Sequence, residues 1–209
     1  MLATMKIEAK SKIRENNPTR QHILDCGYQL IARQGFSNVG LSQILKHAEV
    51  PKGSFYHYFK SKEQFGEALI QDYFFHYQNE LETHFNAPNS NHYDKLIAYW
   101  QRWIDAQNTQ GVVHTCLVVK LSAEVSDLSE SMRLALLTGA QKIISILSLC
   151  IEAGIKEGTI QVKNPYSTAQ LLYNLWIGSS LLCKLSKNSQ NLEQTMHITK
   201  AILTNQAHF

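Results

Sequence analysis

The sequence predicts an all-α protein, with a small N-terminal domain of three helices that contains a helix-turn-helix, followed by a larger C-terminal helical domain. Three observations carry this prediction. Apolar residues recur at helical spacing along most of the 209 residues, and no β-rich hairpin pattern is found. Two short helical segments flank Glu49-Val50-Pro51, as in a helix-turn-helix. Two later helices are apolar on more than one face, which indicates a core behind them.

The first predicted helix begins at residue 18. Asn17 can act as its N-cap, Pro18 suits the first helical position, and Gly35 ends the apolar periodicity. The preceding segment, residues 1–17, is polar and aperiodic. We therefore expect it to be a flexible N-terminal arm without a fold of its own.

Two short helices follow the first one. Gly40 can serve as the N-cap of the second helix, which Leu41 opens. The third covers residues 52–59 and places Phe55 and Phe59 on one face at positions i and i+4. We expect these two phenylalanines to lie in the core.

The rest of the chain is predicted to be helical between short loops. Ser61 and Gln64 form a capping box at the start of a fourth helix, and residues 87–91 form a loop rich in Pro, Asn and Ser. Further helices are expected over residues 92–108, 115–125, 129–156, 165–185 and 190–204.

The two helices over residues 129–156 and 165–185 are too widely apolar to face a single neighbour. Such a helix buries one side against a core and leaves another side for a second partner. We therefore predict a homodimer whose interface these helices form. Four central positions are candidates for the outward face: Leu147, Ile151, Leu175 and Leu182.

Charge is distributed unevenly along the chain. Up to Lys62 there are ten Lys and Arg against four acids, a balance of +6, and the remainder carries −3. The basic block is either a solvated face or a surface for a polyanion. No signal peptide is found, and no apolar run reaches the roughly 18 residues of a membrane span, so the expectation is a cytoplasmic protein without a membrane partner.

Catalytic and metal-binding patterns are not found in the sequence. The nine histidines are dispersed, and the four cysteines are widely spaced without a C-x-x-C pair, so we expect reduced thiols and no metal site. No G-x-S-x-G, H-E-x-x-H or phosphate-binding glycine loop occurs. These observations predict a protein that is not an enzyme and has no cofactor.

Residues 35–36 and 41–63, the latter reading LSQILKHAEVPKGSFYHYFKSKE, closely resemble the signature of TetR-family repressors. The resemblance implies double-stranded operator DNA as partner, with the helix at 52–59 in the major groove. It also implies a C-terminal domain for sensing and dimerisation. The domain boundaries are then 1–17 for the arm, 18–64 for the DNA-binding domain and 65–209 for the sensing domain.

The expected DNA contacts follow from this resemblance and from side-chain chemistry. Lys52 and Lys62 can bind phosphates, and Gly53 lets the backbone approach DNA. Three consecutive aromatic residues cannot all face inward, so packing and base contact remain alternatives for each of them. The predicted DNA-binding residues are Thr19, Arg20, Ser42, Lys52, Gly53, Ser54, Tyr56, His57, Tyr58 and Lys62.

Glu49 departs from the family pattern, which often has glycine at this position of the turn. If the turn requires a positive φ, Glu49 adds some backbone strain.

Residues 116–125 and 127–130 resemble the NemR branch of the family, which implies release by reactive electrophiles or oxidants, or by a small-molecule inducer. Cys116 is the expected sensing residue. It lies near the start of a short helix, with Lys120 and His114 close in sequence, and we expect a lowered thiol pKa there. The resemblance assigns a matching lysine to Lys184, whose pKa we expect burial between the long helices to depress.

The other candidates are interpreted as structural. Cys26, next to Gly27 on a buried helix face, and Cys150 and Cys183 in the long helices are expected to be inert core thiols. Eight aromatic residues either belong to the core or line a ligand pocket: Tyr73, Tyr77, Tyr93, Tyr99, Trp100, Trp103, Tyr173 and Trp176. Two functional alternatives stay open, a helical thiol enzyme using Cys116 and a DNA-binding factor that responds to no effector.

Overall fold

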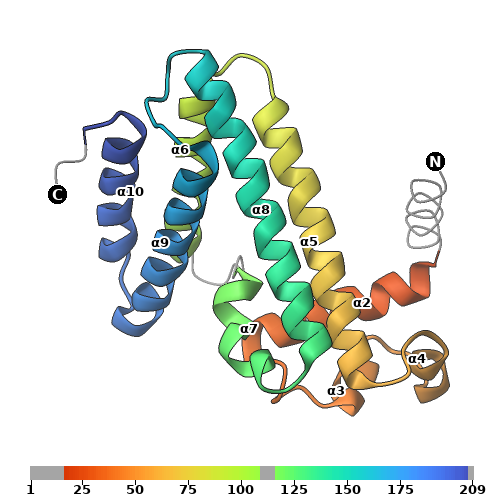
Figure 1. Ribbon diagram of the computed structural model, residues 1–209. Helices are drawn as coiled ribbons and strands as arrows, with labels where there is room; N and C mark the ends of the chain where they lie inside the picture. The colour runs from red at the N-terminus through yellow and green to blue at the C-terminus, as the bar shows by residue number, and fades with distance from the viewer. Residues whose placement is uncertain (1–16, 109–115, 207–209) are drawn as a thin grey trace, which may run out of the picture.

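The computed structural model describes residues 17–108 and 116–206, and all regular structure in these ranges is α-helical (Figure 1). This confirms the predicted fold class. The predicted arm lies outside the described residues except for Asn17, as do Gly111 and His114. The helices are α2 (Pro18–Gln34), α3 (Leu41–His47), α4 (Lys52–Tyr58), α5 (Lys62–Asn86), α6 (His92–Asn108), α7 (Leu117–Ser126), α8 (Glu130–Lys156), α9 (Pro165–Ser186) and α10 (Gln190–Leu203).

The helices form a small end and a larger body. Helices α2, α3 and α4 gather at one end of the molecule, where α5 and α8 also begin (Figure 1). From there α5 and α8 run side by side through the body, α6 and α9 pack against α8, and α10 packs against α6 and α9. The short helix α7 lies next to the small end, beside α2. Because α5 begins in the small end and continues through the body, it connects the two mechanically.

Side-chain caps set the helix starts that the sequence predicts. Asn17 Oδ1 accepts a hydrogen bond of 3.2 Å from the Arg20 N–H at the start of α2. Ser61 Oγ accepts one of 3.2 Å from the Gln64 N–H at the start of α5, and Gln64 Oε1 accepts one from the Lys60 N–H at 2.6 Å. Each cap satisfies an N–H group that the helix itself leaves free.

The central pair α5 and α8 approaches closely at Gly139. A Cβ atom added there would lie 2.1 Å from Cδ2 of Phe74, far inside van der Waals contact. Phe74 is buried, with 3% of its surface exposed. Glycine on α8 thus makes room for the phenylalanine ring of α5, and a larger residue would push the two helices apart.

Helix α8 corrects one expectation from the sequence. It is long and apolar enough, by length and composition, to cross a membrane, whereas the sequence analysis found no such run. The helix nevertheless packs along α5, α6, α7 and α9, and residues such as Ile143 and Leu147 are buried there. Contacts within the fold account for part of its apolar character, and exposed leucines remain on its other faces.

Two of the four positions expected to face outward are buried. Leu147 and Ile151 are 1% and 0% exposed, because α5, α6 and α9 cover that face of α8. Leu175 is half-buried, and Leu182 is 52% exposed as expected. Solvent-exposed leucines do occur on other faces of α8 and α9: Leu134, Leu137, Leu149, Leu171, Leu181, Leu182 and Leu185.

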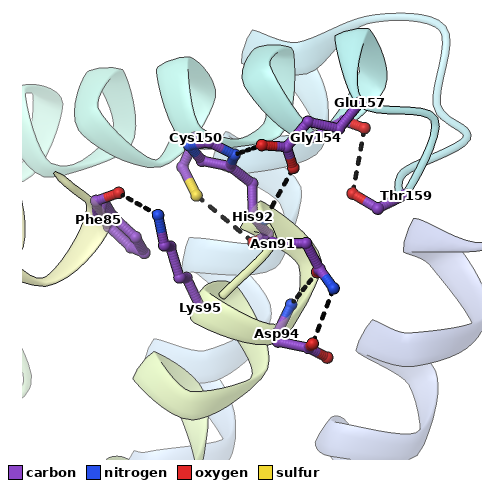
Figure 2. A network of polar contacts seen from close by, with 9 residues as sticks. All are labelled: Phe85, Asn91, His92, Asp94, Lys95, Cys150, Gly154, Glu157 and Thr159. Atoms are coloured by element: carbon purple, nitrogen blue, oxygen red, sulfur yellow. Dashed lines mark hydrogen bonds and ion pairs between the residues drawn. The ribbon is translucent and has the colours of Figure 1, made fainter. Parts of the chain in front are cut away.

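A polar network closes the end of the body farthest from α4 (Figure 2). The His92 N–H donates to Glu157 Oε2 at 3.0 Å, and His92 Nδ1 donates to Oε1 at 2.6 Å. Cys150 Sγ donates to the His92 carbonyl at 3.6 Å, and the buried ammonium of Lys95 donates to the Phe85 carbonyl at 2.9 Å. The network joins the start of α6 to the ends of α5 and α8.

Candidate nucleic-acid interface and cysteine cavity

Phe55 of α4 and Phe59, the C-cap residue of α4, point into the core. Phe55 and Phe59 are 0% and 2% exposed, and their rings pack with that of Phe65 from α5 at centroid distances of 5.1 to 5.5 Å. Ring pairs at such distances contribute beyond their buried area. The predicted core placement of Phe55 and Phe59 is confirmed, and it fixes which side of α4 faces outward.

The outward side of α4 carries the remaining predicted residues. Tyr56 is 48% exposed, and its ring centroid lies 5.8 Å from the Lys52 Nζ. No side chain lies within 4 Å of the Cβ position at Gly53 in the described part of the chain, so that surface is open. A cation, hydroxyls and an imidazole on one exposed helix suit phosphate and base contacts. The exposed residues are Lys52, Gly53, Tyr56 and His57, and Ser54 and Tyr58 are half-buried.

The three contacts expected from α2 and α3 lie near this surface. Thr19 and Arg20 are half-buried in the first turn of α2, and Ser42 is exposed in the first turn of α3. The Arg20 guanidinium carbon lies 5.3 Å from the centroid of the Phe59 ring. This cation–π contact ties the start of α2 to the end of α4.

Lys62 has a partner within the protein. Its Nζ donates to the Phe36 carbonyl at 2.8 Å and lies 4.4 Å from the centroid of the Phe36 ring. Burial lowers the pKa of Lys62, although the nearby Glu124 and Glu63 act in the opposite direction. The ammonium therefore holds the turn after α2, and this contact competes with the phosphate contact expected from the sequence.

The turn between α3 and α4 does require a positive φ. Glu49 has φ 52°, in the left-handed region that glycine adopts more readily. The departure from the family pattern at this position thus has its expected consequence in the backbone. The turn forms with Glu49 at some cost in strain.

A cavity of about 820 Å³ lies where α2, α5, α6, α7 and α9 meet. Its wall is rich in tyrosine hydroxyls, and those of Tyr77 and Tyr99 share a hydrogen bond of 2.9 Å. Of the expected aromatic candidates, Trp100 and Trp176 instead stack in the core at a centroid distance of 4.7 Å. The aromatic residues that line the cavity are Tyr28, Tyr73, Tyr77, Tyr99 and Trp103.

Cys116 lines this cavity as the N-cap residue of α7. The expected lowering of its pKa is wrong: burial raises the pKa of the thiol, because the thiolate loses hydration. The amide groups of Val119 and Val118, the Tyr173 hydroxyl and Lys184 act in the opposite direction without overcoming burial. The helix start does favour the thiolate, but its effect is the smaller one.

Lys184 lines the same cavity from the last turn of α9. Desolvation lowers its pKa, and Lys120 adds to this, whereas Cys116 raises it. The direction is the expected one, but the residue is exposed and does not lie buried between the long helices. Lys120, expected beside the thiol, instead donates to the Arg33 carbonyl at 3.0 Å.

The other thiols are buried in the fold, as expected. Cys26, Cys150 and Cys183 are 7%, 4% and 0% exposed. Burial raises the pKa of Cys26, and it raises the pKa of Cys150 to about 12. None of these three lines the cavity, which leaves Cys116 as the cysteine on its wall.

Several residues around the cavity and the small end were not singled out from the sequence. Tyr28 of α2 lines the cavity, although α2 belongs to the small end. Tyr173, which the sequence did single out as an aromatic candidate, is buried, and its hydroxyl has no hydrogen-bond partner among the described residues. Glu124 of α7 accepts a hydrogen bond from the Phe36 N–H at 3.0 Å. The described residues contain no group of three or more His, Cys, Asp or Glu side chains that could hold a metal ion.

The exposed face of α4, set on a three-helix end and followed by a helical body, defines a DNA-binding regulator with a helix-turn-helix. Residues 23–69 match the family of bacterial regulatory proteins known as the tetR family, and residues 93–199 match a tetracyclin repressor-like C-terminal domain. The chain belongs to the TetR family.

Individual proteins of the family are similar to this chain over most of its length. The chain is 42% identical to the HTH-type transcriptional repressor NemR of Escherichia coli K12, over 89% of this chain and 94% of that protein. The crystal structure of reduced E. coli NemR superimposes with a TM-score of 0.86, covering 92% of this chain and 100% of that one at 41% identity. The repressor DhaR of a Mycobacterium species is 31% identical over 87% of this chain and 90% of its own length.

Proposed function

We propose that this chain is a transcriptional repressor that binds a pseudopalindromic operator as a homodimer and is released when a reactive electrophile or oxidant modifies Cys116. Its similarity to a protein named as a repressor supports the first part. One observation carries the second: Cys116 begins α7 inside a cavity that Tyr28 of α2 also lines. A change at the thiol therefore takes place next to a helix of the DNA-binding end.

We propose that the two ends of the molecule have different functions. Residues 18–64 form the DNA-binding domain and residues 65–209 the sensing and dimerisation domain, with α5 crossing the boundary. Lys52 and residues of the exposed face of α4 supply phosphate and base contacts. Thr19, Arg20 and Ser42 contact the backbone of the DNA from α2 and α3.

The proposed dimer uses the leucine-rich outer faces of α8 and α9. Leu182 and Leu149 are 52% and 65% exposed, a large apolar surface for helices of a monomer. Pairing with the same faces of a second copy removes this surface from water and makes a four-helix interface. Two recognition helices are then held about one turn of DNA apart, as a pseudopalindrome requires.

The chemistry at Cys116 differs between the two reagent classes. With a maleimide, the thiolate adds to the activated carbon–carbon double bond, and a proton from solvent completes the adduct. With hypochlorous acid, the thiol is oxidised to a sulfenic acid while chlorine is reduced to chloride. Because burial raises the pKa of Cys116, the reaction with a maleimide draws on a small thiolate population and accelerates as pH rises.

Lys184 is the proposed partner of the oxidised thiol. Its neutral amine attacks the sulfur of the sulfenic acid, a sulfur–nitrogen bond forms and water leaves. A lowered pKa enlarges the neutral fraction of the amine that this step needs. The position of both residues on one cavity wall supports the pairing.

Three alternatives give different results in solution. A small ligand that fills the cavity without a covalent bond would release DNA even from a Cys116→Ser protein. A thiol enzyme would turn over peroxide with a reductant, although a raised thiol pKa disfavours such a role. A factor without an effector would keep its operator affinity under every reagent.

The proposal is tested with DNA from immediately upstream of the protein's own gene. Wild type and Cys116→Ser are compared by gel shift, with and without N-ethylmaleimide. We expect both proteins to shift the DNA and only the wild type to release it. Cys183→Ser is the matched control, because that thiol is fully buried and its loss should leave release intact. Full release of the Cys116→Ser protein would refute a sensing role for Cys116.

A further inference from the structure

Two side chains of α7 hold the end of α2. Glu124 accepts hydrogen bonds from the N–H groups of Phe36, at 3.0 Å, and Ser37. One turn earlier on α7, the Lys120 Nζ donates to the Arg33 carbonyl at 3.0 Å. The carboxylate thus binds two free N–H groups of the turn after α2, and the ammonium binds a free carbonyl of its last turn. We call Glu124 and Lys120, with these contacts, the α7 latch.

The turn is shaped to receive Glu124. Gly35 has φ 88°, a conformation that L side chains rarely adopt, and a Cβ added there would lie 2.9 Å from Glu124 Oε2. Phe36, next in sequence, is buried, and Lys62 holds its carbonyl from the start of α5. The α7 latch therefore binds a segment that packs into the core of the DNA-binding end.

Glu124 is held as a carboxylate. Burial opposes its ionisation, but the hydrogen bonds from Ser37 and Phe36 together with the charge of Lys120 outweigh burial and lower its pKa. Hydrogen bonds to an ionised acceptor are roughly twice as strong as those between neutral groups. The contact with Phe36 and Ser37 is thus strong enough to transmit a displacement of α7.

Cys116 and Glu124 lie near opposite ends of one rigid element, with Lys120 between them. Eight residues separate Cys116 from Glu124, and a helix rises about 1.5 Å per residue, so their positions along the helix are about 12 Å apart. Leu117, Leu121 and Val125 are fully buried along the same helix. A bulky group on the thiol enters the cavity that Cys116 lines, and a displacement of the N-cap reaches the far end of α7 because the helix is packed along its length.

We propose that the α7 latch is the coupling element that carries a change at Cys116 to the helix-turn-helix. This inference rests on the proposed sensing function. When α7 shifts, Glu124 and Lys120 pull the end of α2 and its turn with it, which changes the orientation of α4 on DNA. Without the latch, α7 moves alone and the DNA-binding end keeps its position.

The test compares wild type, Glu124→Gln and Lys120→Met. Operator affinity is measured by fluorescence anisotropy before and after treatment with N-ethylmaleimide, and mass spectrometry measures the adduct on Cys116. Glu130→Gln is the matched control, because it removes an exposed carboxylate of α8 that pairs with Arg133, away from the turn. Circular dichroism checks that every variant is folded.

We expect both latch variants to bind the untreated operator within about twofold of wild type and to form the adduct to the same extent. Their loss of affinity on modification should be smaller than that of wild type by about fivefold or more, the lower range of allosteric coupling. Glu130→Gln should behave as wild type. Release equal to wild type in both latch variants overturns the inference, and so does weak binding by the untreated folded variants. If wild type itself is not released, the proposed sensing function fails.

Discussion

Cys116 and Lys184 line one cavity, the former from the N-cap of α7 and the latter from the last turn of α9. Burial raises the pKa of the thiol and lowers the pKa of the ammonium, so the site favours the neutral form of both groups. A neutral thiol protects against nonspecific alkylation, and a neutral amine is ready to attack oxidised sulfur. These directions agree with the proposal that Lys184 attacks the sulfur only after an oxidant has activated it.

Tyr173→Phe should make Cys116 less reactive. The buried hydroxyl of Tyr173 favours the thiolate, so its removal should raise the pKa of Cys116 further and slow alkylation at pH 7 by about threefold or more. The rate of iodoacetamide labelling at Cys116 is measured against pH by mass spectrometry. Tyr93→Phe, outside the cavity lining, is the control. An unchanged pH profile would show that the hydroxyl has no influence on the thiol.

The free energy of unfolding provides a second measurement on the Tyr173→Phe variant. The hydroxyl can stabilise a thiolate at Cys116, but beside the neutral thiol it is buried without a hydrogen-bond partner among the described residues, and such a group costs free energy in the folded state. We therefore expect the free energy of unfolding to stay the same or rise. A marked loss would indicate a hydrogen bond that the fold depends on.

Lys52→Ala and Tyr56→Ala should impair DNA binding in different ways. Loss of one phosphate contact at Lys52 should weaken operator and random DNA alike and reduce the salt slope by about one unit. Tyr56→Ala should weaken the operator more than random DNA, by about 1–3 kcal/mol. Anisotropy titrations at several salt concentrations measure both effects.

Lys62→Ala, which also lies in the DNA-binding end, should differ from Lys52→Ala in its effects on stability and on the salt slope. Since its ammonium is bonded to the Phe36 carbonyl, we expect a lower free energy of unfolding and little change in the salt slope. A salt slope reduced by a full unit with unchanged stability would instead place Lys62 on a phosphate. Wild-type affinity in both Lys52→Ala and Tyr56→Ala would mean that α4 is not the recognition helix.

Leu182→Glu should dissociate the dimer. The side chain is 52% exposed on α9, so a charge there is tolerated in the monomer but not in an apolar interface. Sedimentation velocity at micromolar concentration should show a folded monomer with weak operator binding. Leu128→Glu, also exposed but in the turn before α8, should remain dimeric. A wild-type monomer under these conditions would contradict the proposed interface.

Glu157→Gln should destabilise the protein in a pH-dependent manner. Hydrogen bonds from the backbone and ring of His92 lower the pKa of Glu157 below its ordinary value of 4.5. The stabilisation by the carboxylate is therefore present above pH 4.5 and is lost as pH falls through the lowered pKa. Thermal unfolding should separate the variant from wild type at neutral pH, and the difference should shrink as the pH is lowered below 4.5. A difference that stays the same at every pH would exclude this linkage.

The helices and the helix-turn-helix could be predicted from the sequence because their signals are local. Asn17, Gly40 and Ser61 precede helices as expected, and the observed bounds of the predicted helices agree within one or two residues. The i, i+4 spacing of Phe55 and Phe59 also determines which face of α4 is exposed. These features depend on neighbours in the chain, which a sequence displays directly.

The chemistry of the cavity could not be predicted, because it depends on distant segments. The sign of the pKa shift at Cys116 follows from burial by helices far away in sequence, and the latch joins Glu124 to Phe36. The faces of α8 were equally ambiguous, because apolar residues surround it. Leu147 and Ile151 turned out to face the core, and only packing against α5, α6 and α9 decides this.

The most direct test of the account follows modification and DNA release in one sample. Hypochlorite is added stepwise to the repressor bound to a fluorescent DNA from upstream of its gene. The fraction of DNA released is measured by anisotropy, and the fraction of modified Cys116 by mass spectrometry. The account predicts that the two fractions rise together while Cys26, Cys150 and Cys183 remain reduced. Release with unmodified Cys116, or retained DNA with Cys116 fully modified, would contradict it.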